Sequence, residues 1–351
     1  MKTEFCKIGA LAQGRAPDAS DAEILDRAAE ILRSGGLVAF PTETVYGLGA
    51  NALDAEAAKK IYAAKGRPSD NPLIIHIANV ADADKYCYTN ELYRELAARF
   101  LPGPLTVILK KRDVIPLTVT GGLDTVAVRL PSDPTARELI RRAGIPIAAP
   151  SANRSGKPSP TKAEHVLEDM DGRIEMIIDG GECKIGLEST IVSISDGHLN
   201  LLRPGGITVE MLEEVCPVSI DKAVTEKLSD GERPLAPGMK YRHYAPDTKV
   251  VLLDGSDAEV ADYIKRNAPN GKIGLILSDN DAHLAAGTDA KLLTFGDGDI
   301  DEAHRLFALL REVDRLGCDV IYARLPDKQG IGLAVYNRIL KAAGYEILRL
   351  G

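Results

Sequence analysis

The sequence predicts an α/β protein of two domains, a twisted mixed sheet followed by a smaller, open, Rossmann-like sheet. Its 351 residues exceed the roughly 100 to 200 residues of one typical domain. Short apolar runs alternate along the chain with amphipathic stretches of helical spacing. A polar stretch rich in proline and glycine, residues 229–246, interrupts this alternation. We therefore expect a first domain that ends near residue 206, a linker over 207–246 and a second domain over 247–351.

The elements of the first domain follow from apolar spacing and from the residues that stop it. Ser20-Asp-Ala-Glu23 is typical of a capping box, so we expect a helix over 21–33 that ends before Gly35. The apolar run 37–40 ends at a proline and predicts a buried strand. The same reasoning predicts helices over 55–64, 91–100, 134–142, 162–170 and 209–215, and strands over 73–77, 105–109, 125–130, 146–149, 175–178, 190–194 and 199–202. Because several strands follow one another directly, we expect a mixed sheet.

In the second domain strands and helices largely alternate, which favours an open parallel sheet. We expect strands over 249–253, 272–277, 291–294 and 320–323, and helices over 258–266, 301–315 and 332–343.

The composition excludes several classes of protein. The net charge is -8, and 45% hydrophobic with 27% charged residues is ordinary for a globular chain. No apolar run approaches the roughly 20 residues of a membrane helix, and the first residues mix acid and base too early for a secretory signal. We therefore expect a cytoplasmic protein without a membrane partner. Five scattered cysteines without a Cys-x-x-Cys pair predict free thiols, and the absence of tryptophan disfavours a single-strand nucleic-acid binder.

Several standard catalytic motifs are absent from the sequence. A P-loop is excluded because Gly156-Lys157 is followed by proline. No Gly-x-Ser-x-Gly elbow, His-Glu-x-x-His helix or Cys/His zinc spacing occurs, so covalent catalysis and protein-held zinc are disfavoured. Residues 47–52, Gly-Leu-Gly-Ala-Asn-Ala, do resemble a dinucleotide-binding turn between a strand and a helix, which leaves an oxidoreductase as an alternative.

Polar and cationic residues recur at the ends of the predicted strands and helices of the first domain. Lys65 and Arg67 follow a helix, where they either complement its dipole or clamp a phosphate. Arg129, residues 150–153 and Arg203 each stand at or just after the end of a predicted strand. Such groups suit the neutralisation of phosphate charge, so we expect one site for phosphoryl or nucleotidyl transfer.

Eight motifs, taken together and in order, resemble the YrdC-like family of L-threonylcarbamoyladenylate synthases over residues 17–206. They are Pro41-Thr-Glu-Thr-Val-Tyr-Gly-Leu-Gly49, Lys65-Gly-Arg67, Asn71-Pro-Leu-Ile-Ile-His76, Leu101-Pro-Gly-Pro-Leu-Thr106, Val128-Arg-Leu-Pro131, Ser151-Ala-Asn153, Ser189-Thr190 and Arg203-Pro-Gly205. Residues 237–246 and the domain after them are similar to the long, two-domain form of the family.

The resemblance implies a reaction in which L-threonine, bicarbonate or CO2, and ATP give threonylcarbamoyl-AMP and pyrophosphate. A separate transferase would use the product to modify the adenosine next to the anticodon of certain tRNAs. It further implies a Mg²⁺ held mainly by the ATP phosphates, with no metal ligand from the protein, and a linker that crosses the site. Weak RNA binding is an additional expectation.

The resemblance also assigns site residues. Lys65 and Arg67 would be catalytic. The family positions for nucleotide binding match Arg67, Asn71, Thr125, Ser151, Ser159, Arg203 and Tyr241, to which we add Lys65 and Asn153. Threonine binding would involve Thr44, His76, Arg129, the Ala149 backbone and Ser189, with Arg129 on the carboxylate. A non-catalytic module that binds double-stranded RNA stays open as an alternative.

Overall fold

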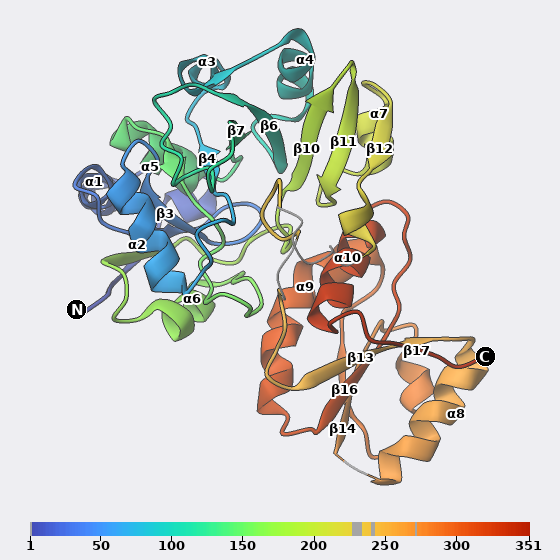
Figure 1. The fold of residues 1–351 in the computed structure, drawn as a ribbon. Helices are drawn as coiled ribbons and strands as arrows, with labels where there is room; N and C mark the ends of the chain where they lie inside the picture. The colour runs from blue at the N-terminus through green and yellow to red at the C-terminus, as the bar shows by residue number, and fades with distance from the viewer. Residues whose placement is uncertain (1, 227–233, 240–242, 271) are drawn as a thin grey trace. The chain divides into compact units, whose positions relative to one another are not determined.

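The computed structural model describes residues 2–226, 234–239, 243–270 and 272–351 (Figure 1). The chain divides into two compact units, residues 1–155 with 159–240, and residues 156–158 with 241–351. No helix in these described ranges is long and apolar enough to cross a membrane.

The first unit is built on a 12-stranded sheet in the described part of the chain. Parallel pairs such as β4 with β7 stand beside antiparallel pairs such as β6 with β7, which confirms the predicted mixed sheet. The strands, in spatial order, are β1 (Glu4–Lys7), β9 (Met176–Asp179), β2 (Val38–Phe40), β3 (Gly47–Asn51), β8 (Ile147–Ala148), β4 (Ile74–His76), β7 (Thr125–Arg129), β6 (Leu105–Lys111), β10 (Thr190–Ser195), β11 (His198–Arg203) and β12 (Val218–Ile220), with β5 (Cys87–Tyr88) beside β6.

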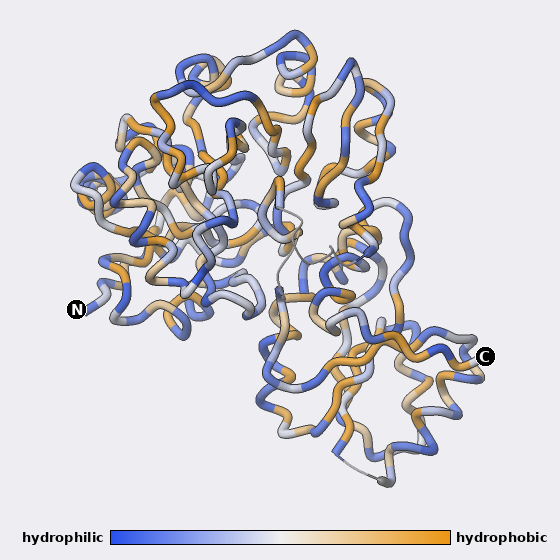
Figure 2. The backbone as a smooth tube through the Cα atoms, viewed as in Figure 1, coloured by the Kyte–Doolittle hydropathy of each residue, from blue (hydrophilic) through white to orange (hydrophobic). Residues whose placement is uncertain are grey.

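Amphipathic helices cover this sheet, and Figure 2 shows apolar residues concentrated along the strands and alternating with polar ones along the helices. The helices are α1 (Ala19–Arg33), α2 (Ala55–Lys65), α3 (Ala83–Tyr86), α4 (Glu91–Phe100), α5 (Pro134–Ala143), α6 (Ala163–Met170) and α7 (Val209–Glu213). Leu25 and Leu32 of α1 pack with Leu139 of α5 against Phe40 of β2 in one core cluster. Burial of these side chains stabilises the two helices on the sheet, at about 1.5–3 kcal/mol for each large apolar residue.

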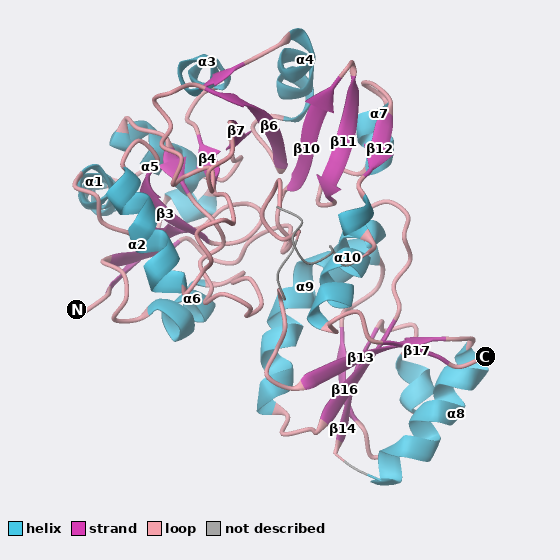
Figure 3. Cartoon of the chain, viewed as in Figure 1, coloured by secondary structure: helices cyan, strands magenta, loops and turns pink. Residues whose placement is uncertain are grey.

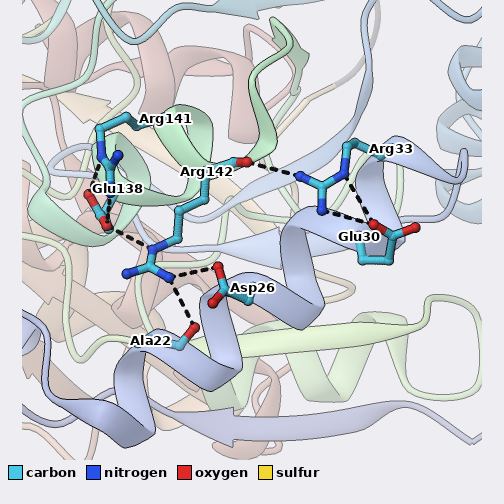
Figure 4. A network of polar contacts seen from close by, with 7 residues as sticks. All are labelled: Ala22, Asp26, Glu30, Arg33, Glu138, Arg141 and Arg142. Carbon is cyan, nitrogen blue, oxygen red and sulfur yellow. Dashed lines mark hydrogen bonds and ion pairs between the residues drawn. The ribbon is translucent and has the colours of Figure 1, made fainter.

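The outer edge of the α1–α5 contact is polar. The Arg142 guanidinium donates to Asp26 Oδ1 at 2.6 Å and to Glu138 Oε1 at 2.7 Å, and Arg33 donates to the Arg142 carbonyl at 2.9 Å (Figure 4). These bonds link the two helices where their apolar faces end.

The predicted capping box of the first helix is wrong. The helix begins at Ala19, and its N-cap is Asp18, whose carboxylate accepts from Asp21 N at 2.9 Å. Asp21, which the prediction placed inside the box, is instead buried and accepts from Gly9 N and Leu11 N. The cap lies at Asp18 and not at Ser20, because the carboxylates of both Asp18 and Asp21 accept hydrogen bonds from backbone N–H groups.

The dinucleotide-binding turn at residues 47–52 is also wrong. Gly47–Asn51 form β3, a buried strand antiparallel to β2, where the prediction had a loop. A Cβ at Gly49 would lie 2.8 Å from side-chain atoms of Phe40 and Ile147. The glycine therefore allows close packing within the sheet, and no turn is available to cradle a pyrophosphate.

The second unit contains a five-stranded sheet in which every pair is parallel, as predicted. Figure 3 shows its strands between α8 on one side and α9 with α10 on the other. The spatial order is β15 (Lys291–Thr294), β14 (Ile273–Leu277), β16 (Val320–Arg324), β13 (Lys249–Asp254) and β17 (Ile347–Arg349), and the helices are α8 (Asp257–Asn267), α9 (Asp299–Glu312) and α10 (Gly332–Ala342).

Candidate functional site

One row of residues crosses five neighbouring strands of the large sheet on the same face. His76 of β4 pairs with Arg129 of β7, and Arg129 pairs with Thr106 of β6. Thr106 pairs with Ile191 of β10, and Ile191 pairs with Arg203 of β11. Directly paired residues point to the same side of a sheet, so these five form one line. We call it the polar row, because all of its residues except Ile191 are polar. Three residues predicted for the site, His76, Arg129 and Arg203, are thus brought together by strand register.

The next row on this face is apolar and is covered by the linker. Ile74, Ala127 and Ile108 are paired across β4, β7 and β6. They cluster with Ala236 and Met239, which are 0% and 4% exposed. The described linker segment 234–239 therefore packs on the same sheet face as the polar row.

Arg203 joins the far end of the polar row to this linker segment. Its Nε donates to the Ser189 carbonyl at 3.0 Å, its Nη2 to Ser189 Oγ at 3.1 Å and its Nη1 to the Pro237 carbonyl at 3.5 Å. Ser189 Oγ in turn lies 2.7 Å from Thr106 Oγ1. Ser189, another predicted residue, therefore stands beside the polar row.

Arg129, the second residue of the row, faces a buried carboxylate. Its Nη2 lies 2.8 Å from Glu43 Oε1, and the two residues are 4% and 5% exposed. Within the described residues, neither Glu43 oxygen has a hydrogen-bond partner, and neither do Arg129 Nε and Nη2. The site residues predicted from the sequence do not include Glu43, although Glu43 lies within the polar motif 41–49 that follows a buried strand.

His76 is neutral at the pH values where most enzymes work. It is 3% exposed, and burial, together with the charge of Arg129, lowers the pKa of its imidazole to about 3. Its Nδ1 has no hydrogen-bond partner in the described ranges. The ring therefore offers a neutral polar edge next to Arg129.

Lys65, the last residue of α2, holds the loop after β8 through hydrogen bonds. Its Nζ donates to the Ser151 and Asn153 carbonyls, each at 2.5 Å. Ser151 Oγ donates to Asn153 Oδ1 at 2.5 Å. These three predicted residues therefore form one hydrogen-bonded corner.

Arg67 and Asn71 lie close to this corner along the chain. The Arg67 guanidinium donates to the Pro72 carbonyl at 3.1 Å and to the Asn71 carbonyl at 3.4 Å. Asn71 is 2% exposed, and its Oδ1 has no partner in the described part of the chain.

Backbone hydrogen bonds tie three loops together between this corner and the polar row. Glu43 O accepts from Ile185 N at 2.8 Å, and Thr44 O accepts from Gly186 N at 3.1 Å. Tyr46 accepts from Ala152 N at 2.8 Å and donates to Pro160 O at 2.9 Å, so the loop after β2 contacts both other loops.

The remaining predicted residues have these positions. Thr44 is fully buried, with Oγ1 2.8 Å from Thr42 Oγ1, and Ser159 donates to Glu188 Oε1 at 2.5 Å. Ala149 is held by a bond from its N to the Ile74 carbonyl at 2.9 Å. Thr125 begins β7 and shares the face of Arg129, four residues away. Tyr241 lies outside the described residues.

Metal ligands do not cluster in the described ranges. There, no group of three or more His, Cys, Asp or Glu is arranged to hold a metal ion.

Two family models together match most of the chain. The model named Sua5_yciO_yrdC, described as telomere recombination, matches residues 30–205. The model described as threonylcarbamoyl-AMP synthase, C-terminal domain, matches residues 207–344.

Curated relatives match over nearly the full length. A threonylcarbamoyl-AMP synthase of Pyrococcus abyssi is 49% identical over 333 residues, 92% of this chain and 95% of the relative. One of Bacillus subtilis is 46% identical over 334 residues, 92% of this chain and 94% of the relative. The crystal structure of P. abyssi Sua5 complexed with L-threonine has a TM-score of 0.89 and 45% identity and covers 100% of both chains. Escherichia coli YciO, at 22% identity and a TM-score of 0.53 over 60% of this chain and 99% of its own, shares the fold.

Proposed function

The chain belongs to the family of threonylcarbamoyl-AMP synthases, and from this premise we propose how its own residues divide the work of the reaction. It is an enzyme of the nucleotidyltransferase type that makes threonylcarbamoyl-AMP, a tRNA-processing intermediate, from L-threonine and ATP. The observation that carries the division is the buried guanidinium of Arg129, which is ion-paired to Glu43 while its Nε and Nη2 have no hydrogen-bond partner among the described residues.

During the reaction negative charge accumulates on the phosphate groups of ATP. In our proposal the ammonium of threonine first loses a proton, and the resulting amine attacks CO2, with loss of a second proton, or bicarbonate, with loss of water, to form a carbamate. A carbamate oxygen then bonds to the α-phosphorus of ATP, and the bond to the pyrophosphate oxygen breaks. A site for this sequence needs an amino-acid receptor next to a group of cations.

Threonine binds at the Arg129 end of the polar row. A planar guanidinium holds a carboxylate through two parallel hydrogen bonds, and Arg129 Nε and Nη2 are two such donors. Ser189, Thr44, neutral His76 and the Ala149 backbone complete the threonine half of the site, and Ser189 Oγ and Thr106 Oγ1 are paired hydroxyls beside Arg129.

Polar groups of this kind distinguish threonine from valine. Binding of valine would leave buried polar groups unpaired, at about 1–3 kcal/mol each. Rejection of serine depends on one methyl group and is correspondingly weaker, about 1–3 kcal/mol in total.

ATP binds at the corner of Lys65 and Arg67 and along the row to Arg203. These three cations neutralise the phosphates, and Lys65 and Arg67 act on the reacting phosphorus. The polar side chains that contact the nucleotide are Asn71, Thr125, Ser151, Asn153 and Ser159. Tyr241 of the linker is assigned to the nucleotide by the family resemblance, and this assignment stays a prediction.

Mg²⁺ enters with ATP as part of the substrate. The phosphates and water would supply its oxygen ligands. The ion would neutralise charge on the phosphates.

The linker covers the site. Pro237 accepts from Arg203, and Ala236 and Met239 pack beside the polar row, so segment 234–239 excludes water from this sheet face. We propose that the linker, residues 207–246, crosses the site during turnover, as the family resemblance implies for a chain with domains over 17–206 and 247–351. A separate threonylcarbamoyl transferase takes up the product, and weak RNA contact would assist that transfer.

The test is pyrophosphate release by the full chain. With ATP, threonine and bicarbonate all present we expect pyrophosphate, and omission of any one should stop its release. Pyrophosphate formation that ignores threonine would contradict the proposal. Salt-dependent binding of double-stranded RNA without turnover would support the non-catalytic alternative instead.

A further inference from the structure

Two buried carboxylates of the first unit differ in how their oxygens are used. Asp21 is 1% exposed, and its Oδ1 and Oδ2 accept from Gly9 N at 2.7 Å and Leu11 N at 2.9 Å. Glu43 is 5% exposed, and neither of its oxygens accepts a hydrogen bond from the described residues. Asp21 therefore has a complete structural environment, whereas Glu43 does not.

The ion pair with Arg129 does not complete Glu43. The 2.8 Å separation of Arg129 Nη2 and Glu43 Oε1 gives charge attraction, but Nη2 and Nε also lack hydrogen-bond partners in the described ranges. A buried ion pair repays its desolvation only when further hydrogen bonds satisfy both members. This pair leaves an anion and a cation side by side, each with open hydrogen-bonding capacity.

The backbone holds this arrangement in place. Glu43 O and Thr44 O both accept hydrogen bonds from the loop at Ile185 and Gly186, and Arg129 lies within β7. The carboxylate and the guanidinium are therefore carried on fixed elements, as a preorganised receptor requires.

A ligand that completes both members must carry opposite charges on neighbouring atoms. An α-amino acid does, since its carboxylate and its ammonium are attached to one carbon. Along the row, His76 is neutral and Thr106 and Ser189 carry hydroxyls. Asp133, another carboxylate that acts on Glu43, accepts from Ala136 N as the N-cap of α5. Glu43, the carboxylate 2.8 Å from Arg129, therefore supplies the negative charge for an ammonium group.

We propose that Glu43 binds the α-ammonium group of threonine while Arg129 binds its carboxylate, so that the pair recognises the zwitterion. This inference rests on the proposed function, because it assumes that threonine is the amino-acid substrate. Glu43 is then a specificity residue of the reaction, and it orients the nitrogen that forms the new bond to carbon. The simpler reading is that Glu43 only holds Arg129 in position.

The experiment compares two ligands on the full chain by calorimetry without ATP. L-Threonine carries the ammonium, and (R)-3-hydroxybutyrate is the same molecule with hydrogen in its place. For the unmodified chain we expect hydroxybutyrate to bind at least about tenfold more weakly, because it leaves Glu43 unpaired. Equal affinity for the two ligands would overturn the proposal without any variant.

The variant Glu43→Gln separates recognition from positioning. We expect it to lose at least about tenfold in threonine affinity while hydroxybutyrate affinity stays within about twofold, so the preference disappears. If Glu43 only positions Arg129, both ligands lose affinity by the same factor, since both carry the carboxylate, and this result would also overturn the proposal. An unmodified chain that binds neither ligand would refute the threonine site, and hence the proposed function, rather than the role of Glu43 alone.

Asp21→Asn is the matched control. It removes a buried carboxylate whose oxygens both accept backbone bonds, so its thermal unfolding temperature should fall. Its ratio of threonine to hydroxybutyrate affinity should equal that of the unmodified chain. A change in this ratio would show that general loosening of the fold alters ligand preference, and would overturn the assignment to Glu43.

Discussion

The two halves of the site use their cations differently. In the nucleotide half, Lys65, Arg67 and Arg203 all donate to main-chain carbonyls. In the threonine half, Arg129 Nε and Nη2 have no hydrogen-bond partner among the described residues and face the equally open Glu43. The proposed threonine half thus presents a buried ion pair with hydrogen-bonding capacity left among the described residues, whereas the cations of the proposed nucleotide half also hold the loops around them.

The largest effect should come from the open cation. Arg129→Gln removes two charge-assisted hydrogen bonds, worth about 1.5–3 kcal/mol each, so threonine affinity should fall by about a hundredfold or more. ATP affinity should change by less than about threefold, because the carboxylate contact is not shared with the nucleotide. Calorimetry with each ligand measures both.

Arg142→Gln is the control for this change. Arg142 is bound to Asp26 and Glu138 at the α1–α5 edge (Figure 4). If Arg142→Gln also lost threonine affinity, the loss in Arg129→Gln could not be assigned to a contact with threonine. If Arg129→Gln kept its threonine affinity, Arg129 would not bind the carboxylate.

Lys65→Met should give the next largest effect, because it should lower both the free energy of unfolding and the catalytic rate. The variant leaves the buried carbonyls of Ser151 and Asn153 without the ammonium, at about 1–3 kcal/mol each, so the free energy of unfolding should fall. The catalytic rate should also fall by about thirtyfold or more, because the nucleotide corner loses its shape and a cation. Denaturant unfolding and pyrophosphate release report the two. A fully active but destabilised variant would limit Lys65 to a structural clamp.

Arg67→Ala should show the nucleotide role with a smaller loss of stability than Lys65→Met. Arg67 is only half-buried, so the unfolding temperature should shift little, while kcat/KM for ATP falls by about tenfold. Steady-state kinetics with varied ATP measure this. An unchanged rate would contradict the placement of the phosphates at this corner.

His76 should have no effect on stability near neutral pH and should act only as the pH falls. Its folded pKa of about 3 lies below the ordinary 6.5, so the unfolded chain binds a proton in this interval and the folded chain does not. The free energy of unfolding should therefore fall as the pH drops from about 6.5 toward 3, by at most about 1.4 kcal/mol per pH unit.

The variant His76→Gln tests this directly, because it removes the titrating group. Its stability should depend less steeply on pH over the same interval, as followed by denaturant unfolding at several pH values. Exposed His198→Gln should leave the slope unchanged. A slope that His76→Gln does not alter would show that the imidazole is charged in the folded chain.

The sequence predicts most elements because their apolar spacing is regular. Helices such as α4 and strands such as β2 lie within a residue or two of their expected bounds. The short strands β1, β5, β12 and β17 were not predicted, because two to four residues form them only through pairing with distant partners. The first helix cap was predicted at Ser20 because Asp18, the residue that caps the helix, stands only two positions before it. The glycines of β3, which allow close packing within the sheet, have the spacing of a phosphate-binding turn.

The site could be predicted as a set of residues but not as a pattern of contacts. Strand ends and motifs indicate Arg129, Arg203 and Ser189. They do not show that register aligns His76 with Arg129, nor that a carboxylate meets that arginine, because both depend on sheet order. Glu43 was missed for this reason.

The most direct test of the account is a crystal structure of the full chain with L-threonine and a non-hydrolysable ATP analogue. We predict threonine on the polar row, with its carboxylate on Arg129 and its ammonium on Glu43, and the triphosphate at Lys65 and Arg67. Threonine bound away from Arg129, or a triphosphate on another face of the sheet, would contradict the division of the site into these two halves.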